Sequence, residues 1–319
     1  MILEKYRPDL QDEWDDFVDN HSSNGILFHK MKFLSYHGDK FEDTSLLIRD
    51  DKKIIIAVFP SIISSNTIIS HQGSSYGGLV LKRNLKLKEI DDILTLIIDY
   101  YKTKLKADST KIILQEKFEP AKNDVLEFLL FQKGFQITSK EISTAIYTID
   151  FFNYSGMRKS TRQYIKSGKI NNIGVEYFIA EEKEDIVEAY NIISSNLKKK
   201  YNKTPTHSLE EILELKNRFM DDIKFFCARE GDVIIGVYVI FALDKNVLHT
   251  FYISSKEDSQ NVKDIGIVNS IMLYAKEKNY KYLNFGISSR GKEIKWWIHN
   301  YKEQYSKHFF TRDTWECEL

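Results

Sequence analysis

Cysteine, proline and long apolar runs are scarce in this sequence of 319 residues. The two cysteines, Cys227 and Cys317, lie far apart and form no CxxC pair or Cys/His cluster, so neither a metal site nor a disulfide framework is expected. Four Pro and 14 Gly exclude collagen-like chains and long flexible linkers. The longest apolar run, 233–243, falls far short of the ~20 residues that span a bilayer. Because the N-terminus also lacks a signal-peptide pattern, we expect a soluble, cytoplasmic protein.

Charge of either sign is not in excess, since Lys+Arg and Asp+Glu both number 46. This balance disfavours a protein that coats nucleic acid, and we expect no DNA partner. No Ser-His-Asp arrangement, Walker loop or dinucleotide fingerprint can be read, which argues against a hydrolase, a kinase and a dehydrogenase. A hydrophobic content of 42% and the length together predict large cores in about two domains.

Two halves of the sequence predict the same order of elements: strand, two helices, hairpin, strand, helix, strand and a tail. For example, LLIRDDKKIIIAVFP (46–60) is similar to FFCAREGDVIIGVYV (225–239). In the first half we expect strands at 2–6, 45–49, 54–61 and 111–115, and a strand-like run at 68–81 that is broken by HQGSSYGG. Helices are expected at 11–20, 29–36, 87–105 and 123–133, and a strand-rich segment at 135–150. In the second half we expect strands at 175–180, 223–229, 233–243, 247–254 and 280–286, and helices at 184–200, 209–220 and 265–278. The pattern predicts mixed α/β structure with a domain boundary near 153/154.

A resemblance to a known family rests on four segments: NGILFHKMKFLSYH (24–37), ISHQGSSYGGLVL (69–81), MRKSTRQYIKSGKINNIGVE (157–176) and residues 278–313. With this element order, the chain resembles the FemABX-like transferases, which carry the GNAT acyltransferase fold twice. Two family features differ here. The block Phe-Lys-x-x-Phe-Gly reads YKEQYS (301–306), and the slot of the Gly-rich pyrophosphate loop reads NVKDIG (261–266). The resemblance implies tandem GNAT-like domains: residues 1–153 shape an acceptor groove, and residues 154–319 hold the donor site and the C-terminal tail.

The function that the resemblance implies is N-acyl transfer. An acyl or aminoacyl group would pass to an amine of a bacterial cell-envelope glycan or peptidoglycan precursor, as in polysaccharide biosynthesis. The donor would be acyl-CoA or aminoacyl-tRNA, and no metal is expected. The expected partners are this donor, a glycan or nucleotide-linked acceptor, tRNA under the second alternative, and peripheral contact with a lipid-linked substrate. Three alternatives stay open: an aminoacyl-tRNA-dependent peptidyltransferase of the FemX type, a non-catalytic GNAT-fold binding protein, and a tRNA- or RNA-binding protein without acyl transfer.

In the first half, the loop HQGSSYGG (71–78) is rich in groups that bind polar ligands. His71, Ser74 and Ser75 would hydrogen-bond to sugar hydroxyls or phosphates, while Tyr76 would stack on a ring; the alternative is a bulged strand at a sheet edge. The resemblance places Phe28, His29 and Tyr36 at the wall of the acceptor groove. For His29, a packing role is the alternative.

In the second half, Arg158, Arg162, Lys166 and Lys169 recur at helical spacing and form one positive stripe. No acid occurs between 155 and 174. Such a stripe suits the phosphates of a diphosphate-linked sugar, of CoA or of tRNA. The alternative is an ordinary solvated helix face.

Catalytic candidates are His249, Lys302 and Asp313. His249 would be a general base on the strand at 247–254, with a structural role as the alternative. Lys302 would stabilise negative charge, and Asp313 would accept a proton or pair with Arg312. If side chains alternate along the strand, Thr250 and Tyr252 share a face opposite His249 and Phe251. Further binding candidates are Tyr252, Asn284, Gly286, Ser288 and Arg312. Trp296 and Trp297 are interpreted as packing residues, with the alternative that one of them lines the pocket.

Overall fold

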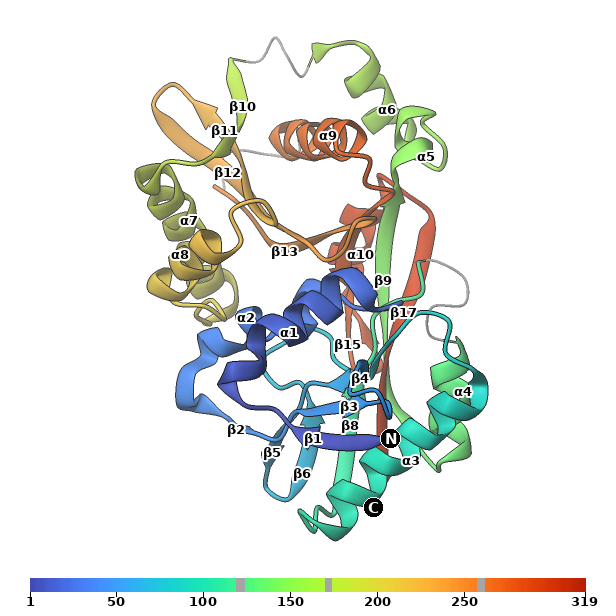
Figure 1. The fold of residues 1–319 in the computed structure, drawn as a ribbon. Helices are drawn as coiled ribbons and strands as arrows, with labels where there is room; N and C mark the ends of the chain where they lie inside the picture. Colours follow the sequence, from blue (N-terminus) through green and yellow to red (C-terminus); the bar gives the residue numbers. More distant parts are fainter. Residues whose placement is uncertain (119–123, 170–173, 257–261) are drawn as a thin grey trace. The chain divides into compact units, whose positions relative to one another are not determined.

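The computed structural model describes residues 1–118, 124–169, 174–256 and 262–319 (Figure 1). Contacts along the chain separate two units. Unit 1 comprises Met1–Ile142, Gly291–Glu293 and Phe310–Leu319, and unit 2 comprises Ser143–Arg290 and Ile294–Phe309. Among the described residues, no helix has both the length and the apolar character needed to cross a membrane.

Unit 1 carries a four-stranded sheet with the strand order β1-β3-β4-β7, together with its helices. Its other strands, β17-β8-β6-β5-β2 in order, are part of an 11-stranded sheet. The strands are β1 (Ile2–Lys5), β2 (Glu42–Asp43), β3 (Leu46–Arg49), β4 (Ile55–Phe59), β5 (Ile62–Ser64), β6 (Thr67–Ser70), β7 (Val80–Leu81), β8 (Ser109–Ile113), and parts of β9 (Gln136–Tyr147) and β17 (His308–Glu318). The helices are α1 (Gln11–Asp16), α2 (Met31–Leu34), α3 (Leu87–Thr103) and α4 (Asp124–Gln132), with short helical turns at Pro8–Leu10, Phe17–His21, Leu27–His29 and Ser35–Lys40.

The core of unit 1 follows the apolar pattern of its longest helix. Ile90, Leu94, Ile97 and Tyr101 recur on one face of α3 and are all buried, whereas Ile98, expected on the same face, is only partly buried. They pack into one cluster with β3, β4, β6 and β8. Each apolar side chain buried in this way contributes about 1.5–3 kcal/mol to stability.

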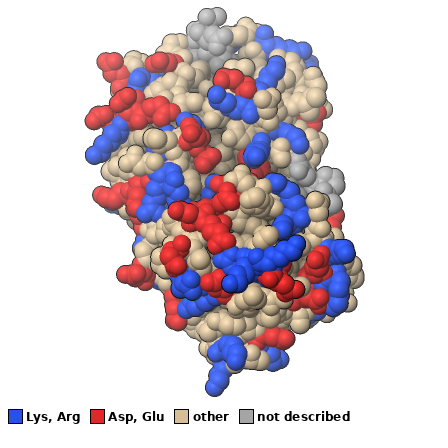
Figure 2. Space-filling model, in the orientation of Figure 1, with Lys and Arg blue, Asp and Glu red and all other residues tan. Residues whose placement is uncertain are grey.

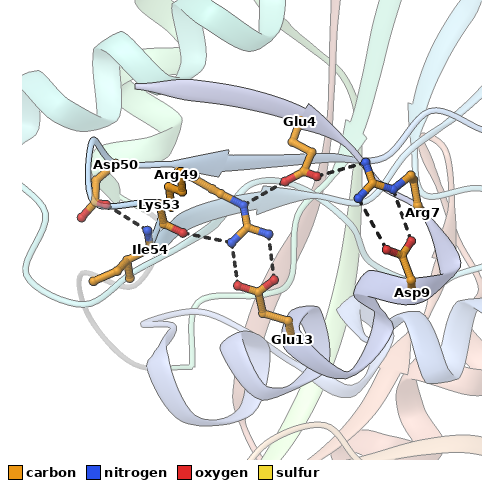
Figure 3. A network of polar contacts seen from close by, with 8 residues as sticks. All are labelled: Glu4, Arg7, Asp9, Glu13, Arg49, Asp50, Lys53 and Ile54. Carbon is orange, nitrogen blue, oxygen red and sulfur yellow. Dashed lines mark hydrogen bonds and ion pairs between the residues drawn. The ribbon is translucent and has the colours of Figure 1, made fainter.

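An arginine network fastens α1 to the first sheet of unit 1 (Figure 3). Arg49 of β3 donates two hydrogen bonds to the carboxylate of Glu13 on α1, 2.6 and 2.7 Å long. Its Nε donates to Glu4 of β1 at 2.9 Å. The arginine beside it holds the pKa of the Glu13 carboxyl below its usual range. The bidentate geometry makes this one of the stronger kinds of surface ion pair.

Unit 2 contains a sheet with the order β10-β11-β12-β13-β14-β9. Its strands are β10 (Val175–Ala180), β11 (Ile223–Glu230), β12 (Val233–Ala242), β13 (Val247–Ser255), β14 (Tyr282–Ile287) and β15 (Ser289–Arg290), with β16 (Glu293–Ile294) at the unit boundary. Its helices are α5 (Thr148–Phe152), α6 (Lys159–Lys166), α7 (Lys183–Tyr201), α8 (Leu209–Arg218), α9 (Val262–Glu277) and α10 (Trp296–Glu303). Helix α9 contacts β10, β11, β12 and β14, whereas α7 contacts β11, β12 and β13 (Figure 1).

The predicted repeat is present in both units. In each, a hairpin (β3–β4 or β11–β12) precedes a strand, a helix and a second strand parallel to the first. The parallel pairs are β6 with β8 across α3, and β13 with β14 across α9. The run at 68–81 breaks into β6 and β7, as its glycine-rich loop indicates. The expected helix at 123–133 is α4, and the residue at 123 lies outside the described part of the chain.

The two compact units differ in their bounds from the predicted domains at 1–153 and 154–319, because two strands, β9 and β17, each contribute residues to both units. We call this sharing of strands strand exchange. Ala145, Ile146 and Tyr147 at the end of β9 pair with β14, so the second unit begins at Ser143. In the tail, Thr314 to Glu318 pair with β8, which returns the last residues to unit 1. The division into domains at 1–153 and 154–319 stays a prediction.

Candidate active site

A parallel pair of strands in unit 2 diverges and opens the candidate site. Val247, Leu248 and His249 of β13 pair with successive residues of β14 from Tyr282 to Asn284, and the pairing then stops. Beyond this point β14 turns at Gly286, whose φ of +70° favours glycine. The Asn284 side-chain oxygen accepts the Gly286 N–H at 2.7 Å and shapes the same turn.

A cavity of about 360 Å³ occupies the opening between these strands. Strand β13 contributes Thr250, Phe251 and its last residues, and α10 contributes Trp297, Tyr301 and Lys302. The last residues of β13 in this lining are Ile253, Ser254 and Ser255. The other lining residues are Asp264, Phe285, Ile298, Asn196, Leu197 and Lys200. Aromatic walls with a few polar groups are typical of a small-molecule site. Trp297 is 60% exposed and lines the cavity, as the alternative for one of the two tryptophans expects. Trp296 is 61% exposed, so it is not the packing residue that the first interpretation expects.

Lys302 is a buried cation in the wall of this cavity. Its side chain reaches back from α10, and Nζ donates to the carbonyl oxygens of Gly286 (2.8 Å) and Ile287 (2.7 Å). The residue is only 3% exposed. The ammonium group therefore satisfies two carbonyls of diverging β14 and places a positive charge beside the cavity.

Asp264 is the one carboxylate among the described residues that line the cavity, and sequence reasoning did not select it. It stands in the first turn of α9 and accepts a hydrogen bond from the Ser255 hydroxyl at 2.5 Å. Burial raises the pKa of its carboxyl above the usual value, although the Ser255 bond and the Lys200 charge act in the opposite direction. A carboxyl whose pKa moves toward neutrality is suited to proton transfer. Of the slot 261–266 in which it stands, Asn261 lies outside the described residues.

A β-bulge at Phe251 changes which side chains of β13 reach the cavity. Thr250 pairs with Ile240 and Tyr252 with Val239, so Phe251 is the extra residue. Thr250 and Phe251 both line the cavity, so the expected alternation is broken. The Tyr252 hydroxyl instead accepts a hydrogen bond from the backbone N–H of His207 at 3.2 Å and shares a second hydrogen bond with the ring Nδ1 of the same residue at 3.1 Å.

His249 is buried beside the cavity rather than in its lining. Its exposed fraction is 6%, and a Cβ added to Gly286 would lie 3.4 Å from its ring. Ser288, 1% exposed, accepts the Lys295 N–H through its carbonyl at 2.8 Å. The structure thus brings His249, Lys302, Asn284 and Gly286 together around the divergence of β13 and β14. Their catalytic and binding roles stay predictions.

Unit 1 places the loop 71–78 at the corresponding point, after β6. The loop is pinned because the Gly78 N–H donates to Ser70 Oγ at 2.8 Å and the Gly77 N–H donates to the Ile113 carbonyl at 2.8 Å. Ser74 Oγ donates to the Tyr76 carbonyl at 2.8 Å. A cavity of about 280 Å³ beside the loop has His71 and His37 in its lining.

The aromatic candidates of unit 1 pack into its interior. Phe28, His29, Tyr36 and Tyr76 are all buried. The Phe28 and Tyr76 rings lie 5.8 Å apart, and the Tyr76 ring faces the Arg312 guanidinium at 5.9 Å. Tyr76 is 1% exposed, so its ring meets protein rather than an open surface. His29 Nδ1 accepts the Ile26 N–H at 3.3 Å, as the packing interpretation expects.

Arg312 and Asp313, predicted as possible partners of each other, each have a different partner on β9. Arg312 Nε donates to Glu141 at 3.1 Å and a guanidinium nitrogen lies 3.4 Å from the Ser75 carbonyl. Asp313 pairs with Lys140. Both belong to unit 1, whereas His249 and Lys302 belong to unit 2. Arg158 and Arg162 lie at α6 of unit 2 and do not line the described cavity.

Two buried histidines predict a steep acid limb in the stability of unit 1. Burial lowers the pKa of His29 and of His71 to about 4. Both stay neutral in the fold while the unfolded chain protonates near pH 6.5. Stability is therefore fully present above pH 6.5 and is lost as pH falls toward 4, by about 1.4 kcal/mol per pH unit for each histidine.

Urea unfolding of parent, His29→Gln and His71→Gln proteins at pH 7, 6 and 5 measures this slope. Each variant is expected to lose one histidine's share of the difference between pH 7 and pH 5, whatever its stability at pH 7. Because the comparison is between variants, buried carboxyls such as Asp15, whose pKa is raised to about 6, cancel. Slopes equal to that of the parent would contradict the assignment.

Comparison with known proteins finds a full-length likeness in structure only. No family model and no curated protein sequence matches the chain. The solved structure of FemX superposes with a TM-score of 0.73 at 11% identity, over 100% of this chain and 98% of that one. L-PGS from Bacillus licheniformis gives 0.63 at 9% identity, over 99% and 93%. A tandem GNAT protein from the clavulanic acid biosynthesis pathway gives 0.53 at 7% identity, over 99% and 98%.

These likenesses fix the fold. The chain has a FemABX-like fold of two tandem GNAT-like halves, as the sequence resemblance predicts. At identities of 7–11% the comparison speaks for the fold alone. Function has to be argued from the cavity and its residues. In the described part of the chain, no group of three or more His, Cys, Asp or Glu side chains could hold a metal ion.

Proposed function

We propose that the chain is an N-acyltransferase that transfers an acyl or aminoacyl group to an amine of a cell-envelope glycan or peptidoglycan precursor. The observation that carries this is the cavity at the divergence of β13 and β14, walled by Lys302 and Asp264, in a FemX-like fold. Unit 2 would hold the donor, and unit 1 would shape the acceptor groove. A lysylphosphatidylglycerol synthetase among the structural neighbours supports aminoacyl chemistry in this fold.

The reaction needs little beyond positioning, one proton acceptor and stabilisation of an oxyanion. The acceptor nitrogen forms a bond to the carbonyl carbon, and the bond from that carbon to the donor's sulfur or oxygen breaks. At the bulge, backbone groups near Phe251 leave the regular ladder beside the cavity, where they would stabilise the oxyanion. Asp264 would take the amine proton, with His249 as the other candidate base. Lys302 would offset negative charge as the leaving group departs.

Asp264 also bears on the donor. An anion in the first turn of α9 opposes a diphosphate at that helix end, where the helix dipole alone would attract it. The same carboxylate would attract the ammonium group of an aminoacyl donor. Asp264 therefore supports aminoacyl-tRNA as a candidate donor beside acyl-CoA. Lys200 in the same lining supplies one positive charge that partly offsets the charge of Asp264.

The test is product formation by the full chain. Purified protein is incubated with acetyl-CoA, longer acyl-CoAs or charged tRNA, together with amino-sugar and peptide-bearing precursors, and new amides are detected by mass spectrometry. We expect Asp264→Asn to lower kcat/KM by about a hundredfold, in the range for loss of a general base. In the parent, activity should rise with pH through the raised pKa of Asp264, because only the carboxylate accepts a proton. The variant should lose this limb.

Asp232→Asn is the matched control. Asp232 is exposed in the β11–β12 turn, and the substitution removes the same charge as Asp264→Asn does. It should leave both kcat/KM and the pH profile unchanged. Saturable donor binding without amide formation for any acceptor would favour the non-catalytic alternative. Amide formation that Asp264→Asn leaves intact would transfer the base role to His249.

A further inference from the structure

Five cations gather at α6 with no acid in the same stretch of sequence. Arg158, Lys159, Arg162, Lys166 and Lys169 fall within a segment, 151–175, that contains no Asp or Glu. Figure 2 shows blue side chains gathered at the upper right, over α6. The proposed acyl transfer gives this positive stripe no role.

The inner face of α6 is fixed and leaves these cations outside. Thr161, the buried residue of the helix, donates from its hydroxyl to the Gln304 side-chain oxygen at 3.2 Å. The Arg158 N–H donates to the Gln304 carbonyl at 2.9 Å, and α6 contacts α9. Arg158, Lys159 and Lys166 are exposed and Arg162 is half-buried.

Apolar and aromatic groups lie on α5, which packs on the same helix α9. Ile149 is 70% exposed there. Beside it, a groove of about 550 Å³ is lined by Tyr147, Phe152, Tyr280 and Tyr282 together with two lysines, and no carboxylate is among its described lining residues. The acid of α5, Asp150, is held by His308 Nε2 at 2.6 Å. Lys276 and Lys281 thus line the same groove as Ile149 and the aromatic residues.

We propose that this α5–α6 surface, from Thr148 to Lys169, binds the headgroup region of an anionic phospholipid bilayer. Its positive charge complements the lipid phosphates, and Ile149 with the aromatic edges would enter the interface, where amphipathic rings are favoured. This role is independent of acyl transfer. It would hold the chain beside acceptors that are carried by the membrane.

The aromatic rings of this surface bear on whether its partner is a bilayer or RNA. Single-stranded RNA needs open aromatic faces on which bases stack. Here Lys166 lies over the Tyr154 ring at 4.6 Å and Lys276 lies over the Phe152 ring at 4.5 Å. His308 stacks on Tyr147 at 4.0 Å with 9° between the ring planes. One face of each of these three rings is thus covered, and the exposed Ile149 side chain offers no stacking surface at all. This combination of ammonium groups and an aliphatic side chain favours lipid over bases.

Vesicle co-sedimentation tests the proposal without any turnover. The full chain is mixed with phosphatidylcholine vesicles, or with vesicles that also contain phosphatidylglycerol. We expect binding to the anionic vesicles only, weakened by added salt. The variant Arg158→Gln/Arg162→Gln/Lys166→Gln should bind about a hundredfold more weakly, from roughly 1 kcal/mol per basic group. Ile149→Asp, in a different helix, should also weaken binding.

The matched control is Lys198→Gln/Lys199→Gln/Lys203→Gln, which removes the same charge at the end of α7 and should bind as the parent does. Equal loss in this control would reduce the effect to net charge and overturn the assignment. No binding to anionic vesicles, or full binding by both α5–α6 variants, would also overturn it. So would binding of uncharged tRNA through the stripe in a protein that ignores vesicles. Because the measurement needs no donor or acceptor, failure of the proposed catalysis leaves it unaffected.

Discussion

Replacing Lys302 with methionine is expected to remove both turnover and a sizeable part of the stability of unit 2. Methionine fills a similar volume but leaves the Gly286 and Ile287 carbonyls without their ammonium donor. Because the site is buried, two unsatisfied carbonyls should lower the free energy of unfolding by about 2–4 kcal/mol. In the folded variant, loss of a positive charge beside the reacting carbonyl should also lower kcat by about a hundredfold. Urea unfolding and the amide-forming assay measure the two effects separately.

Lys216→Met separates a structural effect from a functional one. Lys216 is another buried lysine of unit 2, 6% exposed, and it donates to Glu181 at 2.9 Å and to the Met220 carbonyl at 3.0 Å. It lies on α8 and does not line the cavity. The Lys216→Met variant should lose about as much free energy of unfolding as Lys302→Met does, while keeping its turnover. Lys302→Met protein that is folded and fully active would remove Lys302 from the proposed site.

Gly77→Ala should disrupt the loop 71–78 more than any other single methyl group added to it. An added Cβ would lie 1.8 Å from the Ser70 carbonyl oxygen, 2.1 Å from its carbon and 2.4 Å from the His71 nitrogen. These are backbone atoms, so no side chain can rotate away. The loop would have to leave β6 and give up the Gly77–Ile113 hydrogen bond. We expect a loss of more than about 4 kcal/mol, or a unit 1 that does not fold, measured by urea unfolding.

Gly38→Ala in the same unit is the control for adding a methyl group. Gly38 has a φ of +56°, but no atom lies within 4 Å of its added Cβ. Only the backbone conformation (φ +56°, ψ −136°) penalises the substitution, at about 1–3 kcal/mol. Similar losses for the two variants would show that the loop yields easily and is not pinned as described.

Elements and their order could be predicted from the sequence because their signals are local. The apolar residues of α3 recur with helical spacing, and the polar turn at 50–53 lies between two apolar runs. Strand β10 has the predicted bounds, and α7 and β13 each extend one residue past theirs at one or both ends. The similarity of 46–60 to 225–239 likewise predicted the repeat, since both stretches form the same hairpin.

The candidate site was only partly predictable. Lys302, Asn284 and Gly286 were selected by their place in the resemblance, and they do meet where β13 and β14 diverge. Asp264 stands in a slot noted for the glycines it lacks, and nothing in the spacing marked its carboxylate. A signal did exist, since an acid in the first turn after a predicted strand-to-helix connection would point toward the same opening.

The sequence by itself determined the secondary structure, the repeat and the absence of a charge excess, because each depends on neighbouring residues or on composition. Only the tertiary structure decided which residues share a cavity. The bulge at Phe251 turned Thr250 and Tyr252 in different directions, and strand exchange returned Arg312 and Asp313 to unit 1. Both depend on register between strands that are distant in sequence. Periodicity reports that a side chain is buried, whereas its neighbours are set by that register.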